Sequence, residues 1–455
     1  MMQNEKRAVL IAASLSSFLT PFMGSALNVA IPVIGKQMHA TAVMVSWVVS
    51  VYLIASAVFL LPFGRLADML GRKRVFLTGV AFFSVFSVLC AISPSIFALI
   101  ASRAAQGIAA AMVFGTAVSL ITSAIPPGER GKALGYNTAT VYIGLSVGPV
   151  IGGFLTQTVS WRAIFLIVAV LAGVTWLFAR RIHSEWSPAK GEPFDTTGAL
   201  LYCLALTLLL SAVSLKQAGA VLVGAAVLLL VIWGVRAGRE AHPLLDLRLF
   251  RESTVFTFST LAALLNYGAT FSVGYLMSLY LQTVRGFTPQ SAGTLLLVQP
   301  VVQAAFSPLA GALSDKREPR IVASAGMLLT TFCLLAYALM PYRASIPFLV
   351  AVLATSGLGF ALFSSPNVNA IMSAVPSARY GVASSVVSTA RMLGQSFGMA
   401  MILLIFSVMM PGMPLSPEHG AELFRSMRVA FGISTVLSLL GVFASLARGR
   451  IHVRQ

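Results

Sequence analysis

The chain consists of long apolar runs separated by short polar connectors. Each run has about 18 to 30 residues, which is the length that an α-helix needs to cross a bilayer. The runs lie near residues 8–34, 43–66, 74–93, 97–123, 131–157, 161–180, 195–214, 219–236, 253–283, 289–314, 319–340, 345–373, 380–409 and 424–446. This pattern predicts an all-α integral membrane protein with 14 transmembrane helices.

Basic residues are distributed unevenly between the two sets of connectors. An even number of spans places both termini on one side, and the connectors on that side carry about three times as many Lys and Arg residues as the others. Because connectors rich in Lys and Arg stay in the cytoplasm, we expect cytoplasmic termini and a multi-pass protein of the cell (cytoplasmic) membrane.

Composition supports a bilayer as the solvent. The chain is 58% hydrophobic and 10% charged, which leaves more apolar surface than a soluble protein can bury. Its net charge of +18 lies in the short connectors, so it indicates topology, and no nucleic-acid partner is expected. The three Cys and five His residues lack ligand spacing, so neither a metal site nor a disulfide framework is expected.

The connector GRLADMLGRKR, Gly64 to Arg74, is a dense group of charges between two apolar runs. We interpret it as a short loop in which Gly64 and Gly71 allow tight turns. It contains a lone acid, Asp68, and a basic cluster that includes Arg72. The order of glycine, spaced aspartate, glycine and paired basic residues resembles the loop between helices two and three of the major facilitator superfamily.

A weaker copy of this connector, GALSDKREPR, occurs at Gly311 to Arg320, with Asp315 in the place of Asp68. Each copy follows the second span of a group of six, as expected for parallel repeats about an axis along the membrane normal. Spans seven and eight then form an inserted pair, and this arrangement resembles the drug:proton antiporter branch of the superfamily. The expected domains are an N-terminal six-helix bundle at 1–181, a linker with two inserted helices at 182–250, and a C-terminal six-helix bundle at 251–455.

The resemblance implies a role for Asp68. In the superfamily this acid latches the two halves together when the transporter faces outward. Span thirteen begins near Arg379 to Gly381, and the positive end of its helix dipole would stabilise a nearby carboxylate by ~0.3 to 1 kcal/mol. Arg72 and Arg74 are candidate counter-charges, and the alternative is that the connector only sets topology.

Span five contains small residues at helical spacing in GLSVGPVIGGF. Gly144, Gly148 and Gly152 are four residues apart, so a neighbouring helix can approach this face closely. Pro149 removes a backbone hydrogen bond and softens the helix. With Gly153, these residues resemble the antiporter motif of the superfamily, which implies export, although an ordinary packing seam would explain the glycines alone.

Arg103 places a charge within span four, where a charge is costly and usually faces a cavity or a partner. It lies about as far from the outer end of its span as Asn28 does in span one, so at ~1.5 Å per residue the two have similar depth. Arg103 and Gln106, in RAAQG, resemble the superfamily motif whose arginine couples proton movement to substrate. The alternative is that Arg103 snorkels or bonds backbone carbonyls.

Several other polar residues lie within the spans. Arg391 is near mid-membrane in span thirteen, one turn before Gln395, and either meets an anionic group of a substrate or bonds a neighbouring helix. The remaining candidates for a central cavity between the halves are Asn28, Asn137, Tyr142, Asn266, Tyr267, Gln299, Gln303, Asn367 and Asn369. Each of them is alternatively an interhelical hydrogen bond worth ~0.6 kcal/mol.

One departure from the antiporter branch concerns span one. The branch carries an Asp ahead of a stretch that ends Asn-Val-Ala-Leu-Pro, whereas the run FMGSALNVAIP has Met23 or Gly24 at that place. Proton coupling commonly uses a carboxylate of raised pKa within the cavity, and all 13 acids of this chain fall at span ends or in connectors. Coupling therefore runs through Asp68 or Asp195, or is weak or absent. Without a deep acid, the pocket should favour neutral or anionic compounds over dications.

These patterns predict a secondary transporter that exports small amphipathic compounds by alternating access, as a monomer, with a proton gradient and no bound cofactor. Alternatives are a dedicated exporter of one endogenous metabolite, an uncoupled facilitator, or a non-transporting membrane sensor. A membrane enzyme is disfavoured because no nucleophile constellation, paired loop carboxylates or sizeable water-exposed domain is present.

Overall fold

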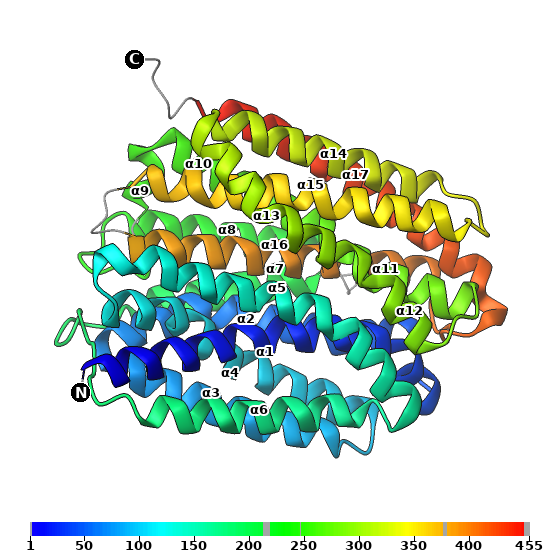
Figure 1. The fold of residues 1–455 in the computed structure, drawn as a ribbon, viewed down its shortest axis with the longest axis horizontal. Coiled ribbons are helices and arrows are strands. Elements are labelled where there is room, and N and C mark those ends of the chain that lie inside the picture. The colour runs from blue at the N-terminus through cyan, green and yellow to red at the C-terminus, as the bar shows by residue number, and fades with distance from the viewer. Residues whose placement is uncertain (1, 213–218, 246, 376–379, 450–455) are drawn as a thin grey trace. The chain divides into compact units, whose positions relative to one another are not determined.

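The computed structural model describes residues 2–212, 219–245, 247–375 and 380–449, without the side chains of residues 2–4, 127, 128, 131, 132, 138, 315, 380, 381 and 384. This part of the chain is helical, and its only β pairing is an isolated bridge between Thr41 and Pro414. The first helices are α1 (Met2–Gln37), α2 (Ala42–Leu70), α3 (Arg72–Ala91), α4 (Ile96–Ala124), α5 (Pro127–Thr158), α6 (Arg162–Arg180), α7 (Thr196–Ala212) and α8 (Gly219–Ala237) (Figure 1). They are followed by α9 (Arg248–Glu252), α10 (Thr254–Thr270), α11 (Ser272–Leu279), the π-helical turn Tyr280–Val284, α12 (Pro289–Leu296), α13 (Val298–Lys316), α14 (Pro319–Leu339), α15 (Ile346–Ser373), α16 (Tyr380–Met409) and α17 (Gly420–Ala447).

Within the described ranges, 12 helical segments are long and apolar enough to cross a membrane. They account for all but two of the spans expected from the sequence. The first exception is α7, an apolar helix of 17 residues. The second is the run of α10 and α11, which is divided at Phe271 into helices of 17 and 8 residues. The count of 14 stays a prediction.

Hydroxyl side chains cap several helix starts that the sequence places ahead of an apolar run. The caps are Ser95 to the Ala98 nitrogen at 3.2 Å, Ser253 to Phe256 at 3.2 Å, Thr288 to Ser291 at 3.2 Å and Ser345 to Phe348 at 3.4 Å. Each cap satisfies one of the backbone N–H groups that a helix leaves open at its first turn. The expected starts near 97, 253, 289 and 345 therefore agree with local capping chemistry.

The chain forms two compact units, and each contains separate stretches of sequence. Unit 1 comprises Met1–Met23, Trp47–Gly144 and Arg162–Arg248, and unit 2 comprises Gly24–Ser46, Leu145–Trp161 and Leu249–Gln455. The division passes through α1 and α5, so the second part of each belongs to unit 2. The bundle boundaries expected at residues 181 and 250 stay a prediction.

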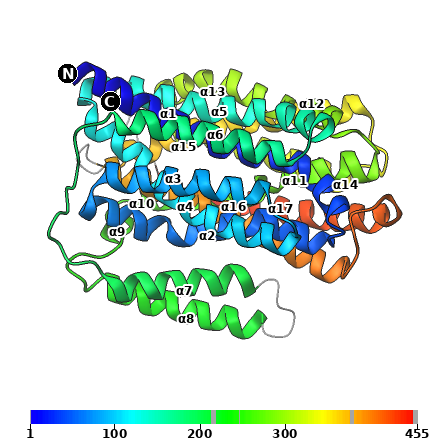
Figure 2. The same cartoon turned by 90° about the horizontal axis from the view of Figure 1, so that it is seen from below.

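In unit 1, the inserted helices α7 and α8 lie antiparallel and side by side (Figure 2). The hydroxyl of Tyr202 on α7 donates to the carbonyl of Ala57 on α2 at 3.4 Å, and the Cys203 thiol donates to the carbonyl of Val58 at 3.5 Å. At the base of the pair, Arg236 contacts Asp195 at 3.2 Å. The inserted pair is therefore attached to the helices of unit 1.

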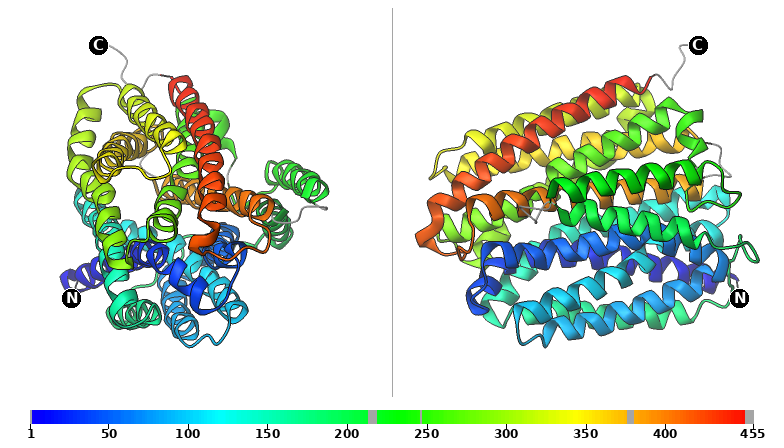
Figure 3. Two further views of the ribbon diagram at one scale, coloured as in Figure 1. Left: turned by 90° about the vertical axis from the view of Figure 1, so that its right-hand side faces the viewer. Right: turned by 180° about the vertical axis from the view of Figure 1, so that it is seen from behind.

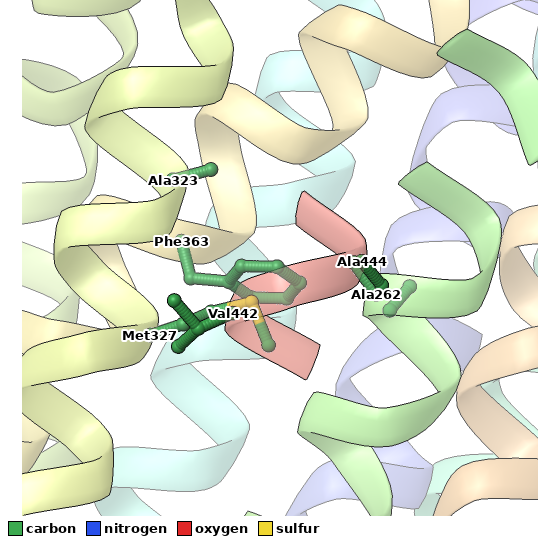
Figure 4. Packing of buried hydrophobic residues seen from close by; sticks show 7 residues of the cluster. Ala262, Ala323, Met327, Phe363, Val442 and Ala444 are labelled. Atoms are coloured by element: carbon green, nitrogen blue, oxygen red, sulfur yellow. The ribbon is translucent and has the colours of Figure 1, made fainter. Parts of the chain in front are cut away.

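In unit 2, α14 and α17 lie side by side (Figure 3). A buried apolar cluster lies among α10, α14, α15 and α17 (Figure 4). It consists of Ala262, Ala263, Ala323, Met327, Phe363, Val442 and Ala444. Small residues allow close helix approach here: a Cβ at Gly326 would lie 2.6 Å from the carbonyl oxygen of Gly359.

Candidate functional site

Arg103 lies on α4 and is only 1% exposed. Its Nε donates to the carbonyl of Val48 on α2 at 3.0 Å, and its Nη1 donates to Oε1 of Gln106 at 2.5 Å. The guanidinium carbon lies 4.0 Å from the ring centroid of Tyr52 on α2, which is a cation–π contact. The structure thus brings together the predicted pair Arg103 and Gln106, and the role of the pair in coupling stays a prediction.

Gln106 extends this network to a third helix. Its Nε2 donates to the hydroxyl of Ser87 on α3 at 2.7 Å, and that hydroxyl donates to the carbonyl of Phe83 at 2.6 Å. The Gln106 amide therefore accepts from Arg103 and donates to Ser87, which fixes the amide orientation. We call Arg103, Gln106, Tyr52 and Ser87 the arginine network.

The arginine network contains a cation but no acid. No ion pair among the described residues includes Arg103, and the guanidinium is held by a carbonyl, an amide and an aromatic ring. A buried charge without a counter-ion is costly within a membrane. An anionic or strongly polar group next to Arg103 would lower this cost, so the network is suited to such a group.

Sequence reasoning did not identify Tyr52 or Ser87. Both lie in apolar spans, and their spacing from Arg103 along the chain carries no signal. They become neighbours only because α2, α3 and α4 pack together.

The connector Gly64 to Arg74, which we call the signature connector, differs in part from the expected loop. Helix α2 continues to Leu70, so Gly64 lies inside a helix and makes no turn, and that expectation was wrong. Gly71 does turn, with a φ of 117°, which is a region that favours glycine. The Cα of Gly64 would lie 3.4 Å from a Cβ at Gly115 on α4, so the physical use of Gly64 is close helix packing.

Asp68 is half-buried and pairs with Arg72 at 2.8 Å, one helical turn away. Arg72 also donates through Nη1 to the hydroxyl of Ser123 at 2.6 Å and to the carbonyl of Ser119 at 3.3 Å, both on α4. Of the two expected counter-charges, Arg72 therefore contacts Asp68, whereas Arg74 is exposed and has no ion pair among those found in the described ranges. The side chain of Asp315 and the residues 376–379 ahead of α16 lie outside the described part of the chain.

The small residues of α5 contact different helices. A Cβ at Gly144 would lie 2.7 Å from the carbonyl oxygen of Phe18 on α1, and one at Gly152 would lie 2.6 Å from the Cα of Ala26 on α1. Gly153 instead meets α12, since its Cβ would lie 2.5 Å from the carbonyl oxygen of Pro289. Gly148 is buried.

Pro149 provides a second contact of α5 with α12. A Cβ at Gly293 would collide with the carbonyl oxygen of Pro149. Helix α5 therefore approaches the backbone of both α1 and α12 closely. The role of these residues as the antiporter hinge that the resemblance implies stays a prediction.

A polar seam joins α1 to α11 and the π-helical turn within unit 2. The hydroxyl of Ser278 donates to the carbonyl of Asn28 at 2.7 Å, and Nε2 of Gln282 donates to the carbonyl of Val29 at 2.8 Å. A further contact joins the start of α2 to α11, where the hydroxyls of Ser46 and Tyr275 lie 2.7 Å apart. Sequence reasoning missed Ser278, Gln282 and Tyr275, because a serine, a glutamine or a tyrosine within an apolar run does not reveal its partner.

The structure separates the cavity candidates by burial and bonding. Asn28, Asn137, Asn266, Gln303 and Asn367 are buried, whereas Tyr142, Tyr267, Gln299, Asn369, Arg391 and Gln395 are half-buried. In the described part of the chain, both amide atoms of Asn266 and the amide oxygens of Asn28 and Asn137 lack hydrogen-bond partners. Buried amides without partners are rare in proteins, so these three asparagines are suited to meet a ligand.

Two of the candidates instead have structural partners. Asn367 accepts from Nη1 of Arg448 at 2.9 Å and donates to the carbonyl of Ser259 at 3.1 Å, while Asn369 donates to the hydroxyl of Ser314 at 3.1 Å. Burial lowers the pKa of Arg448, which lies just beyond α17, to about 10. The interhelical interpretation therefore fits Asn367 and Asn369.

Arg391 lies on the helix that packs against α10. A Cβ at Gly394 would collide with the carbonyl of Leu264, and one at Gly398 would collide with that of Gly268. The glycines next to Arg391 and Gln395 thus allow α10 and α16 to approach closely.

Among the described residues, no three His, Cys, Asp or Glu side chains gather as they would around a metal ion.

Comparisons with known proteins agree on the class. The sequence pattern of the Major Facilitator Superfamily matches residues 13–399 and again 259–453. The chain is 28% identical over 449 residues to the riboflavin transporter RibZ of Clostridioides difficile, covering 97% of each chain. It is 32% identical over 412 residues to the multidrug resistance protein Stp of Mycobacterium tuberculosis, covering 88% of this chain and 76% of that one. In fold it is similar to an inward-facing bacterial homologue of the lysosomal transporter Spinster, with a TM-score of 0.70, 17% identity and 98% of each chain covered.

Proposed function

Because the chain belongs to the Major Facilitator Superfamily, and so is a multi-pass membrane transporter, we propose that it exports small amphipathic compounds by alternating access. The proposal includes 14 helices with both termini in the cytoplasm, as expected from the sequence. It places the protein in the cytoplasmic membrane as a monomer. Relatives named for multidrug resistance and for riboflavin transport support small organic substrates.

The observation that carries the choice of substrate is the arginine network. A buried Arg103 that is held by neutral groups favours anionic or neutral polar compounds over cations. Within unit 2, Asn28 and Asn266 have buried amide atoms without partners among the described residues, and such atoms can bond uncharged groups such as amides and hydroxyls. Riboflavin, which a relative is named for, is a neutral compound of this chemistry.

The cycle that we propose uses the residues expected from the family resemblance. Asp68, paired with Arg72, is the latch that holds the halves in one state. The small residues of α5 around Pro149 permit the close packing of another state, since added side chains there would collide with backbone. Alternation between two such packed states is the basis of transport in this architecture.

The driving force is a proton gradient, with coupling through Asp68. The other acid considered, Asp195, accepts from the Gly198 nitrogen at 2.9 Å and pairs with Arg236 at 3.2 Å. These contacts cap α7 and join it to α8, so they support a structural role for Asp195. Uncoupled facilitation is the second candidate, favoured by Met23 and Gly24 at the place of the branch's acid.

Flux measurements on the purified chain in sealed vesicles test this proposal. Riboflavin and chloramphenicol serve as neutral probes and dequalinium as a dication, with and without an imposed pH gradient. We expect gradient-dependent flux of a neutral probe that is lost in Arg103→Ala, and no flux of dequalinium. Flux of the same rate with and without the pH gradient would favour uncoupled facilitation. Dequalinium flux that is retained in Arg103→Ala but lost in Asp68→Asn would contradict the proposed substrate class.

A further inference from the structure

The segment that joins α6 to α7 lies against the signature connector of unit 1. We call residues 183–192 the strap. The strap contacts the backbone on both sides of the acid: the Ala189 nitrogen donates to the carbonyl of Asp68 at 3.0 Å, and the Arg72 nitrogen donates to the carbonyl of Trp186 at 3.0 Å. One short segment thus holds the connector at the latch acid and at its counter-charge.

Glu185 of the strap caps the start of α3. Its Oε1 accepts from the Lys73 nitrogen at 2.9 Å and its Oε2 accepts from the Arg74 nitrogen at 3.1 Å. The residue at the N-cap position, Gly71, has no side chain with which to cap the helix. A carboxylate at this end also interacts favourably with the helix dipole. Glu185 therefore replaces the missing cap from a position 112 residues away in the sequence.

Both ends of the strap are anchored by charged groups. Glu5 on α1 accepts from the nitrogens of His183 and Ser184 at 2.9 and 2.6 Å. At the other end, Glu192 contacts Arg65 at 2.5 Å and His242 at 3.0 Å. The hydrogen bond from Arg65 lowers the pKa of Glu192, which favours the ionised carboxylate. The strap is held in place independently of Glu185.

The strap and the connector also fit sterically. A Cβ at Gly71 would collide with the Glu185 carboxyl, and the φ of 117° at Gly71 disfavours any other residue. The glycine of the connector thus makes room for the carboxylate of the strap. This assigns Gly71 a second physical role beyond the turn itself.

We propose that Glu185 is a positioning residue for the latch acid Asp68. Arg72 is the first residue of α3 and also the side chain that pairs with Asp68. Fixing the first turn of α3 therefore fixes the counter-charge and, through it, the direction of the Asp68 carboxylate. This inference rests on the latch that we propose above.

A double-mutant cycle tests this role in the full chain. Cys90, Cys203 and Cys333 are replaced, and a cysteine is introduced at Gly24, where a Cβ would meet nothing within 4 Å. Its labelling rate with a maleimide reports the balance of conformational states in proteoliposomes. The variants are Asp68→Asn, Glu185→Gln and their combination. Glu240→Gln is the matched control, because Glu240 is a glutamate that pairs with Arg236 outside the strap.

We expect Glu185→Gln to shift the labelling rate in the same direction as Asp68→Asn, by about fivefold, since a helix cap is worth ~1 kcal/mol. The double variant should match Asp68→Asn alone, because coupled residues are not additive. Glu240→Gln should leave the rate unchanged. Glu185→Asp keeps the charge, so it should retain most of the labelling rate of the parent. It also covers the case in which Glu185→Gln fails to fold.

Two different results would overturn the latch role of Asp68 and the positioning role of Glu185. If Asp68→Asn leaves labelling unchanged, the proposed latch fails, and the positioning role fails with it. If Asp68→Asn acts but Glu185→Gln has no effect, or the two effects multiply, Glu185 is only a structural cap and the inference fails while the latch stands.

Discussion

Arg103 donates a hydrogen bond of 2.5 Å to Gln106, three residues further along α4, inside the helices of unit 1. The same amide donates to Ser87, so the glutamine connects a buried cation to a neighbouring helix. Removal of Gln106 would leave Nη1 of Arg103 without this acceptor and the Ser87 hydroxyl without this donor. The relationship therefore predicts consequences for both stability and substrate choice.

Replacing Gln106 by Leu should lower the free energy of unfolding by ~1 to 3 kcal/mol, because buried polar groups lose their partners. Thermal unfolding in detergent measures this loss. Gln106→Glu should behave differently, since the new carboxylate supplies the counter-charge that Arg103 lacks. We expect it to keep stability and to reduce transport of anionic probes. Unchanged handling of anions in Gln106→Glu would show that Arg103 does not meet the substrate.

Gly293→Ala should destabilise the protein by ~1 to 3 kcal/mol, because the added methyl group collides with the carbonyl of Pro149. The matched control is Gly173→Ala on α6, where nothing lies within 4 Å of the added Cβ. There the change should be neutral or stabilising by ~0.5 to 1 kcal/mol, as for a helix-interior glycine. Equal melting temperatures for the two variants would contradict the close contact between α5 and α12.

Gln282→Leu should loosen the polar seam, because the side chain loses its bonds to the Val29 carbonyl and to Ser278. Hydrogen exchange at the backbone of residues 28–30 should increase about fivefold, which corresponds to the loss of ~1 kcal/mol. Thr355→Val is the control, since the Thr355 hydroxyl donates to the carbonyl of Ala351 on its own helix. If the backbone of residues 28–30 exchanges at the same rate in both variants, the polar seam does not stabilise this part of α1.

Arg448→Gln should destabilise unit 2 by ~2 to 4 kcal/mol. The buried guanidinium bonds Asn367, Ser259 and the carbonyl of Pro319 at 2.9 to 3.2 Å, and its loss removes the donor that each of these buried oxygens has there. Arg425→Gln, at an exposed position near the start of α17, should change the unfolding free energy by less than ~0.5 kcal/mol. A similar loss in both variants would mean that charge alone, and not these bonds, stabilises the end of α17.

Gly24→Asp should extend transport to cations. The position has space for a side chain, and an acid there restores the charge that the antiporter branch carries in span one. Efflux of ethidium from vesicles should increase at least tenfold over the parent, the ratio that corresponds to ~1.4 kcal/mol of added binding. Gly24→Asn, which has the same shape without the charge, is the control. Ethidium efflux that is equal in the two variants would exclude a charge effect.

The sequence alone was sufficient for the class of the protein. Apolar runs of membrane length, a biased distribution of basic residues and the connector around Asp68 all follow from local chemistry, and the family comparison confirms the superfamily. Helix starts such as those after Ser95 and Ser345 were also predictable. The reason is that capping and hydrophobic length depend on residues close together in the chain.

Tertiary structure decided which polar groups have partners. Periodicity could not show that Tyr52 covers Arg103, that Asn367 binds Arg448, or that Glu185 caps a helix 112 residues earlier. It also misplaced the turn at Gly64, since α2 continues to Leu70. In a bilayer almost every face of a helix is apolar, so the sequence pattern identifies a span but not the neighbour that each side chain meets.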